Sequence, residues 1–287
     1  MEPEHRFETA APTYAATRPA YPPEVADWIR TNAGLQAGDR VLDLGAGTGA
    51  LTGPLLEVGF DIQAAEPSAA MREHLVGRFP QVDVVSDTAE RLSARDGTFA
   101  LVCAANAFHW FDPDRAFPEI HRVLTPGGTV AVVWNLPDES DPLQARFGEL
   151  ARELLDEGDC PGALPGDPPG WEGFFVEAEC ATFFHRHRLR AGGLIDYVSS
   201  WSTVTNMDEP DRRRVLETVA QWETGEDVEM PFEVQVNLGT RASQASRRSS
   251  SQPSIAGRMG FGSRPESLMA RLSCFTDARP TNSTCCH

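Results

Sequence analysis

The chain lacks lysine altogether, since all 25 basic side chains among its 287 residues are arginines. This absence is typical of codon bias and excludes no function. Basic residues are also fewer than acidic ones. The 42 acidic side chains leave a formal net charge of -17 at pH 7. Such a charge repels nucleic-acid phosphates, so we expect a small-molecule partner and no nucleic acid.

Long apolar runs and paired cysteine motifs are also missing. No stretch approaches the roughly 20 apolar residues of a membrane helix, and the acidic start Met1-Glu2-Pro3-Glu4 lacks a signal-peptide pattern. We therefore expect a cytoplasmic protein with no membrane partner. The six cysteines show no CxxC spacing, which disfavours structural zinc and a disulfide framework. His185 and His187 would share one face of a strand, but arginines flank them and no acidic residue is adjacent, so we expect no metal.

The composition changes abruptly near Thr240. Residues 240–287 carry seven basic and two acidic side chains, are rich in Ser and Arg, and show little apolar periodicity. A segment of this kind cannot bury enough apolar surface to order itself, so we expect 240–287 to be disordered. Two origins remain open, a flexible arm that contacts an anionic partner and a non-native C-terminus from a shifted reading frame. The change of charge sign favours the second.

Upstream of this tail, apolar strand-like runs alternate with segments long enough for crossover helices. The runs are Arg40–Leu44, Phe60–Ala65, Val82–Val85, Phe99–Ala104 and Thr129–Trp134. This alternation predicts a parallel α/β sheet. Ser68 is expected to cap one helix, and Asp112-Pro113 is expected to open another, which contains an irregular Pro118.

After Trp134 the pattern is that of an inserted helical lid followed by the end of the sheet. The expected elements are a helix through Leu143, Phe147, Leu150 and Leu154, a loop over Cys160–Gly170, a strand over Ala181–Leu189, a helix over Leu194–Trp201, a helix face of Val215, Leu216, Val219 and Trp222, and a strand over Val228–Leu238. The predicted fold is a Rossmann-like, mostly parallel seven-stranded sheet with helices on both faces. Its parts are an N-terminal helical cover (1–35), a cofactor-binding core (36–136), the lid with the sheet-completing strands of the same domain (137–239), and the tail (240–287).

The most specific motif is Val41-Leu42-Asp43-Leu44-Gly45-Ala46-Gly47-Thr48-Gly49. It predicts a buried strand that is followed by a Gly-rich turn and then by a helix. Glycines allow close backbone approach, and open α/β sheets bind ligands at the carboxyl ends of their strands. A dinucleotide site requires GxGxxG, whereas the third glycine here comes one residue early. Asp43 suits a ligand with ammonium and sulfonium groups, which gain from a nearby carboxylate. Glu66, at the end of the second strand, indicates a ligand with an unphosphorylated ribose. It does not distinguish a dinucleotide from a nucleoside that carries a sulfonium group.

Other segments match a known family together with these motifs. They are Phe7–Pro22, Thr88-Ala89-Glu90-Arg91-Leu92, Ala107-Phe108-His109-Trp110-Phe111 and Val123-Leu124-Thr125-Pro126-Gly127-Gly128. Across residues 7–238 the sequence resembles the type-11 class of small-molecule S-adenosylmethionine-dependent methyltransferases.

The resemblance implies S-adenosylmethionine as the cofactor and gives several residues a role. Gly45, Ala46 and Gly47 would line its methionine portion with Asn106 nearby, Glu66 would hold the ribose, and Thr88 with the Ala89 amide would meet the adenine edge. Tyr14 and Arg18 would close over the cofactor, with Arg18 suited to its carboxylate. Thr88 stands where many relatives carry Asp.

Methyl transfer from a sulfonium is an in-line displacement that depends on positioning and on exclusion of water. We expect methylation of a hydroxyl or carboxyl oxygen of a small molecule, with His109 as the candidate base; alternatively, His109 shapes the pocket with Trp110. The acceptor pocket is expected from the N-terminal cover, the helix around Leu143–Leu154, the loop Cys160–Gly170 and the segment Tyr197–Thr205. Its lining is expected to be mostly apolar, with the aromatic residues Trp171, Phe174, Phe175 and Trp201. Two other functions remain open, a cofactor-binding scaffold that does not methylate and an NAD-dependent oxidoreductase.

Overall fold

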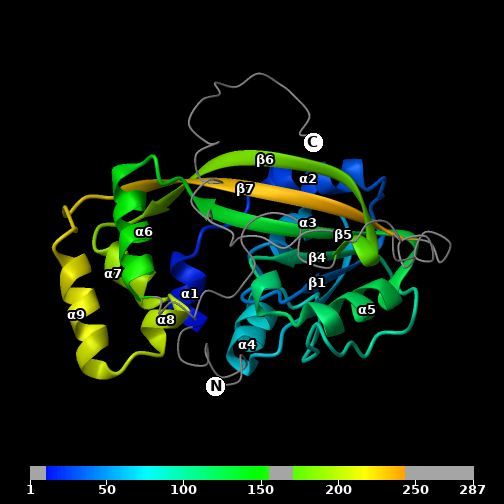
Figure 1. The fold of residues 1–287 in the computed structure, drawn as a ribbon, viewed down its shortest axis with the longest axis horizontal. Helices are drawn as coiled ribbons and strands as arrows, with labels where there is room; N and C mark the ends of the chain where they lie inside the picture. The colour runs from blue at the N-terminus through cyan, green and yellow to red at the C-terminus, as the bar shows by residue number, and fades with distance from the viewer. Residues whose placement is uncertain (1–10, 155–170, 243–287) are drawn as a thin grey trace, which may run out of the picture. The chain divides into compact units, whose positions relative to one another are not determined.

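A computed structural model describes residues 11–154 and 171–242, which belong to one compact unit. The strands form one seven-stranded sheet in the order β3-β2-β1-β4-β5-β7-β6, so the predicted sheet is confirmed (Figure 1). The strands are β1 (Arg40–Leu44), β2 (Asp61–Ala65), β3 (Asp83–Val85), β4 (Phe99–Ala105), β5 (Leu124–Pro137), β6 (Phe175–Leu189) and β7 (Val228–Arg241).

The direction of each strand follows from its apolar pattern. β1 to β5 pair in parallel, and the central strands β1 and β4 are almost continuously buried because helices cover both of their faces. β7 instead alternates between buried and half-exposed residues and pairs antiparallel with both β5 and β6. The order of the first five strands reverses after β1, and their carboxyl ends meet at one edge, where such sheets bind ligands.

Helices cover both faces of the parallel part of the sheet. The helices of the described residues are α1 (Ala11–Thr17), α2 (Pro23–Asn32), α3 (Thr52–Glu57), α4 (Ala69–Arg78), α5 (Pro113–Val123), α6 (Pro142–Leu154), α7 (Gly193–Ser199), α8 (Ser202–Thr205) and α9 (Glu209–Ala220). Ile29 of α2 and Leu55 of α3 belong to the core on one face, whereas Phe117 and Ile120 of α5 belong to the core on the other. Two short 3-10 turns, η2 (Phe108–Trp110) and η3 (Trp171–Gly173), complete the described elements.

The expected caps form where the sequence placed them. Ser68 precedes α4, and its side chain accepts the N–H of Met71 at 3.4 Å. Asp112 precedes α5 and accepts the N–H of Asp114 at 3.1 Å, with Pro113 at the first helical position. These caps fix where two crossover helices begin.

A separate apolar cluster joins the helices after β5 to the ends of β6 and β7. It contains Phe147 of α6, Tyr197 of α7, Val219 of α9 and Phe232 of β7. Figure 1 shows α6, α7, α8 and α9 gathered with α1 at one end of these two long strands, away from α5. The predicted lid helices therefore pack on the extension of the sheet, while α8 was not predicted.

Several element boundaries differ from the prediction. β5 extends from Leu124 to Pro137, and β6 begins at Phe175, six residues before the predicted Ala181. β7 continues to Arg241, and the N–H of the buried Ala242 donates to the carbonyl of Phe174 at 2.9 Å. The boundary at Thr240 thus lies too early, because ladder pairing with β5 and β6 holds these residues despite their composition. Residues 243–287 and the predicted loop Cys160–Gly170 lie outside the described residues.

Candidate active site

The glycine-rich turn after β1 exposes its main chain, free of side chains at Gly45 and Gly47, at the carboxyl edge of the sheet. Gly45 and Gly47 have φ of +69° and +56°, a region that favours glycine. The N–H groups of Gly45 and Ala46 donate to the carbonyl of Ala65, at the end of β2, over 2.8 and 3.2 Å. A Cβ on Gly45 would lie 2.6 Å from the Cβ of Ala107, so this turn requires glycine for space as well as conformation.

Asp43 is a carboxyl group buried beneath this turn. Its side chain accepts a hydrogen bond from Oγ1 of Thr52 at 2.6 Å. Burial is the main cause that raises the pKa of Asp43; the bond from Thr52 opposes it and the nearby Glu66 adds to it, and together they bring the pKa to about 6. A cationic ligand group beside Asp43 would favour the charged form of this carboxyl group. The sequence analysis expects such a ligand.

Glu66 follows β2 and is held by main-chain donors on both of its oxygens. The N–H of Gly47 donates to Oε2 at 2.9 Å, and the N–H of Ser68 donates to Oε1 at 2.9 Å. Burial raises the pKa of Glu66, while these two hydrogen bonds lower it. Each carboxylate oxygen has a second lone pair, so the fixed carboxylate keeps acceptor capacity for a diol.

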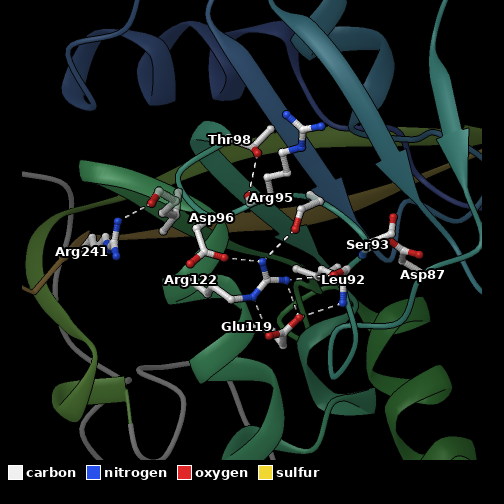
Figure 2. Close-up of polar contacts among 11 residues, drawn as sticks. Asp87, Leu92, Ser93, Arg95, Asp96, Thr98, Glu119, Arg122 and Arg241 are labelled. Carbon is white, nitrogen blue, oxygen red and sulfur yellow. Dashed lines mark hydrogen bonds and ion pairs between the residues drawn. The ribbon is translucent and has the colours of Figure 1, made fainter.

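The Thr88–Leu92 segment is held against α5 by a cluster of polar contacts around Arg122 (Figure 2). The partners of the guanidinium, all within 2.9 Å, are the main-chain oxygens of Leu92 and Ala94 and the carboxylates of Asp96 and Glu119. Glu119 also accepts the N–H of Leu92 at 2.9 Å. The hydrogen bond from Arg122 lowers the pKa of Glu119. This cluster fixes the segment that carries Thr88 and Ala89.

Asn106 directly follows β4 in a left-handed conformation, with φ of +46°. Its Oδ1 accepts the N–H of Asn135 at 2.7 Å, and its Nδ2 donates to the carbonyl of Asn135 at 3.4 Å. The amide side chain is therefore committed to the β5 main chain. Its sequence position gave no sign of this pairing.

Arg18 follows α1 and holds a positive charge among aromatic rings. Its guanidinium lies 4.9 Å from the ring centre of Tyr14 and 5.7 Å from that of Tyr197. Nη2 donates to the carbonyl of Ser200 at 3.3 Å, and the buried Nε has no hydrogen-bond partner within the described ranges. Among the described residues no carboxylate forms an ion pair with Arg18, so its charge is available to an anionic ligand group.

His109 lies in η2, beyond the carboxyl end of β4. Its ring stacks on Trp134 at 5.7 Å between centres and lies 4.8 Å from the ring of Trp110. Burial, with a smaller contribution from the charge of Arg18, lowers the pKa of His109 to about 4. The imidazole is neutral near pH 7 and is a weak base.

One cavity of about 770 Å³ joins these groups, a size within the usual range for small-molecule sites. All predicted site residues line it: Tyr14, Arg18, Asp43, Gly45, Ala46, Gly47, Glu66, Thr88, Ala89, Asn106 and His109. Tyr197 and Trp201 also line it, from the segment in which the sequence placed the acceptor pocket. The N-terminal segment, the strand ends and the lid helices thus all contribute to the cavity wall.

Other predicted aromatic residues lie elsewhere, and the cavity has further lining residues that the prediction missed, Asn135 and Phe232 among them. Trp171, Phe174 and Phe175 pack in or against the core beneath α5, with Phe174 stacked on Phe117 at 5.8 Å, and they do not line this cavity. Asn135 and Phe232, on β5 and β7, line the cavity but were read only as strand residues. A polar residue at the end of an apolar strand was the available signal for Asn135.

His185 and His187 share one face of β6, as expected, and both contact protein groups. Nε2 of His185 lies 3.1 Å from Oδ1 of Asn135, and Nε2 of His187 donates to the carbonyl of Thr17 at 2.8 Å. Within residues 11–154 and 171–242, no group of three or more His, Cys, Asp or Glu side chains could hold a metal ion. In the same ranges, no helix combines the length and apolar character needed to cross a bilayer.

The strand order, the glycine turn and the carboxylate at the end of β2 define a Rossmann-like protein with a nucleoside-cofactor cavity. Comparison with known proteins specifies the family. A model of the methyltransferase domain matches residues 42–132. An uncharacterized methyltransferase of Mycobacterium tuberculosis is 43% identical over 221 residues, which cover 75% of this chain and 84% of the relative.

Two further comparisons agree. A demethylmenaquinone methyltransferase of Renibacterium salmoninarum is 30% identical over 154 residues, covering 52% of this chain and 63% of that protein. A structure described as a type II methyltransferase from Anaeromyxobacter dehalogenans is 28% identical, with a TM-score of 0.55 and coverage of 78% of this chain and 96% of that one. The chain belongs to the class I S-adenosylmethionine-dependent methyltransferases. It is an enzyme that uses S-adenosylmethionine, and the oxidoreductase alternative is set aside.

Proposed function

We propose that this methyltransferase methylates an oxygen, in a hydroxyl or carboxyl group, of a small-molecule acceptor bound in the 770 Å³ cavity. The observation that carries the proposal is that one cavity is lined both by the glycine turn with Glu66 and by an aromatic wall from the lid helices. Its size suits two small ligands better than a macromolecular chain. The Renibacterium relative, a demethylmenaquinone methyltransferase, also supports a small-molecule acceptor.

The residues at the β1 and β2 ends fit S-adenosylmethionine. Glu66, fixed by the N–H groups of Gly47 and Ser68, would accept the ribose hydroxyls. Arg18, which has no ion-pair partner among the described residues, would meet the methionine carboxylate, and Asp43 would face the ammonium side. Gly45, Ala46 and Gly47 would line the methionine portion with Asn106, and Thr88 with Ala89 would meet the adenine. When bound, the cofactor supplies a methyl group on a sulfonium, and S-adenosylhomocysteine is the co-product.

The remaining residues would bind the acceptor and exclude water. Tyr197 and Trp201 come from the lid, and Phe232 comes from β7, so the acceptor would meet mostly apolar surface. A carboxyl acceptor is already ionised at neutral pH and requires no base, whereas a hydroxyl acceptor gains from one. The low pKa of His109 and its stacking on Trp134 favour a neutral wall residue over a general base.

An acceptor panel tests this proposal. The protein is incubated with S-adenosylmethionine carrying a tritiated methyl group and with matched hydroxyl, carboxyl, amine and thiol compounds built on the same aromatic ring. We expect labelled methyl ether or ester, with E66A as the inactive control. Methylation of the amines or thiols alone would contradict oxygen transfer, and labelling only of added protein or nucleic acid would contradict a small-molecule acceptor.

A further inference from the structure

One buried amide nitrogen in the cavity wall has no hydrogen-bond partner among the described residues. Asn135, near the end of β5, is 7% exposed and lines the cavity, and its Nδ2 finds no hydrogen-bond partner in the described part of the chain. A buried N–H that is left unpaired has lost its hydrogen bonds to water without a replacement, which is unfavourable. Such a donor is unusual in a native interior, and one in a cavity wall is placed to be satisfied by a bound molecule.

Every other polar group of Asn135 is already paired. The side chain of Asn106 engages both its N–H and its carbonyl. Its Oδ1 lies 3.1 Å from Nε2 of His185, on β6. Because an amide oxygen only accepts, Nε2 of His185 donates this bond and thereby fixes the orientation of the amide.

His185 is itself held in place by the neighbouring strand. It pairs with Phe232 of β7, and the two rings stack at 5.6 Å between centres with an interplanar angle of 27°. Burial lowers the pKa of His185, with a smaller contribution from His187, so the ring is neutral near pH 7. Phe232 also pairs with Pro137, and both residues line the cavity beside Asn135.

The position of Asn135 separates it from the residues expected to hold the adenosine. In the sheet, β5 lies two strands from β1 and three strands from β2, which carries Glu66 at its end. With neighbouring strands about 4.8 Å apart, Asn135 is displaced by roughly 10 Å from β1 and roughly 14 Å from β2. Asn135 therefore lies on the side of the cavity away from Glu66, on the same part of the sheet as the lining residues Pro137 and Phe232.

We propose that Nδ2 of Asn135 donates a hydrogen bond to an oxygen of the methyl acceptor, and that this acceptor is a flat, mainly apolar molecule carrying such an oxygen. This inference rests on the function proposed above. His185 is a positioning residue that acts through Asn135 by holding its amide oxygen. The apolar walls bind the acceptor frame, and the single fixed donor sets its orientation.

Three probes of nearly equal shape test the donor. They are 1-tetralone, with a carbonyl oxygen, tetralin, with no polar group, and 1,2,3,4-tetrahydroquinoline, with an N–H. Each is titrated by calorimetry against protein saturated with S-adenosylhomocysteine. The quantity compared is the ratio of tetralone to tetralin affinity in variant and wild type, because the different hydration of the two probes cancels in that comparison.

We expect N135L to lower this ratio about tenfold while tetralin binds as before, and N135A replaces it if the leucine variant does not fold. H185F, which keeps a ring on Phe232 but cannot donate, should lower the ratio by a smaller factor, and H185Q, which can donate, should restore it. Q144L is the matched control, since Gln144 is a buried amide that bonds the carbonyl of Pro231 and does not line the cavity. Its ratio should equal that of wild type.

Other results would overturn the inference. They are an unchanged ratio in the Asn135 variants, no binding of any probe to wild type, and a loss confined to tetrahydroquinoline. Binding of S-adenosylhomocysteine without probe discrimination refutes the acceptor site alone. A wild-type protein that binds no S-adenosylhomocysteine refutes the proposed function together with this inference.

Discussion

The N–H of Gly47 donates to Oε2 of Glu66 over 2.9 Å, which joins the turn after β1 to the end of β2. The bond joins the two segments from which the sequence predicts a cofactor site, the glycine turn and Glu66. Any change in the Glu66 carboxylate therefore changes a ligand acceptor and the support of the glycine turn together. The glycine turn and the end of β2 thus form one hydrogen-bonded element at the edge of the sheet.

Gly45→Ala tests the close packing of this turn. A side chain at φ of +69° costs about 1–2 kcal/mol, and its Cβ would also meet Ala107 at 2.6 Å. We expect a larger loss of stability than in G34A, where φ is +66° but nothing lies within 4 Å. Urea unfolding of both variants measures the difference, and equal losses would show that Ala107 yields without cost.

Arg122→Ala should loosen the segment that carries Thr88 and Ala89. It removes charge-assisted bonds to two carboxylates and two carbonyls, so we expect a loss of about 1.5–3 kcal/mol in the free energy of unfolding and weaker S-adenosylhomocysteine binding. The control is R152A, which breaks an exposed ion pair with Glu139 and should cost less than about 1 kcal/mol. Cofactor affinity equal to wild type in R122A would contradict the positioning role.

Asp43→Asn tests the buried carboxyl group through the pH dependence of stability. The folded pKa of Asp43 is about 6, above its ordinary value of 3.8, so the native state holds this proton more tightly than the unfolded chain. Its contribution is complete below about pH 4 and is lost as the pH rises through about 6. Wild type should lose up to roughly 3 kcal/mol relative to D43N between pH 4 and pH 7. Denaturant midpoints of the two proteins that run parallel with pH would contradict the raised pKa.

His109→Gln separates the two roles considered for this histidine. With its pKa near 4, His109 stays neutral through the usual assay range. We expect kcat to fall by less than about tenfold, with the same shape of pH-rate profile between pH 5.5 and 9 for the first acceptor found. Loss of a general base would instead cost about 100-fold or more, and that result would restore the catalytic role.

The sheet and the cavity wall at the ends of β1 and β2 could be predicted because both are local in the sequence. Val41 to Gly49 is a continuous motif in which strand, turn and helix follow one another, and Glu66 ends the next strand. The opposite wall depends on strands that pair across long separations, such as Asn135 with Val234 and His185 with Phe232. No periodicity reveals those partners before the register is known.

The tail boundary illustrates a second limit of sequence patterns. Arg241 has the composition of the following segment, yet its backbone extends β7 and its guanidinium donates to the carbonyl of Leu124 at 2.5 Å. The main-chain ladder continues independently of side-chain type, so the change in composition near Thr240 lies slightly before the end of the strand.

Calorimetric titration of wild type and E66A with S-adenosylhomocysteine, S-adenosylmethionine and NAD tests the central claim most directly. We predict that wild type binds both sulfur compounds in the micromolar to submillimolar range, that NAD does not compete, and that E66A binds them at least tenfold more weakly, with a folded state shown by its thermal transition. Absence of binding to both sulfur compounds, or wild-type affinity in folded E66A, would contradict the assignment of this cavity.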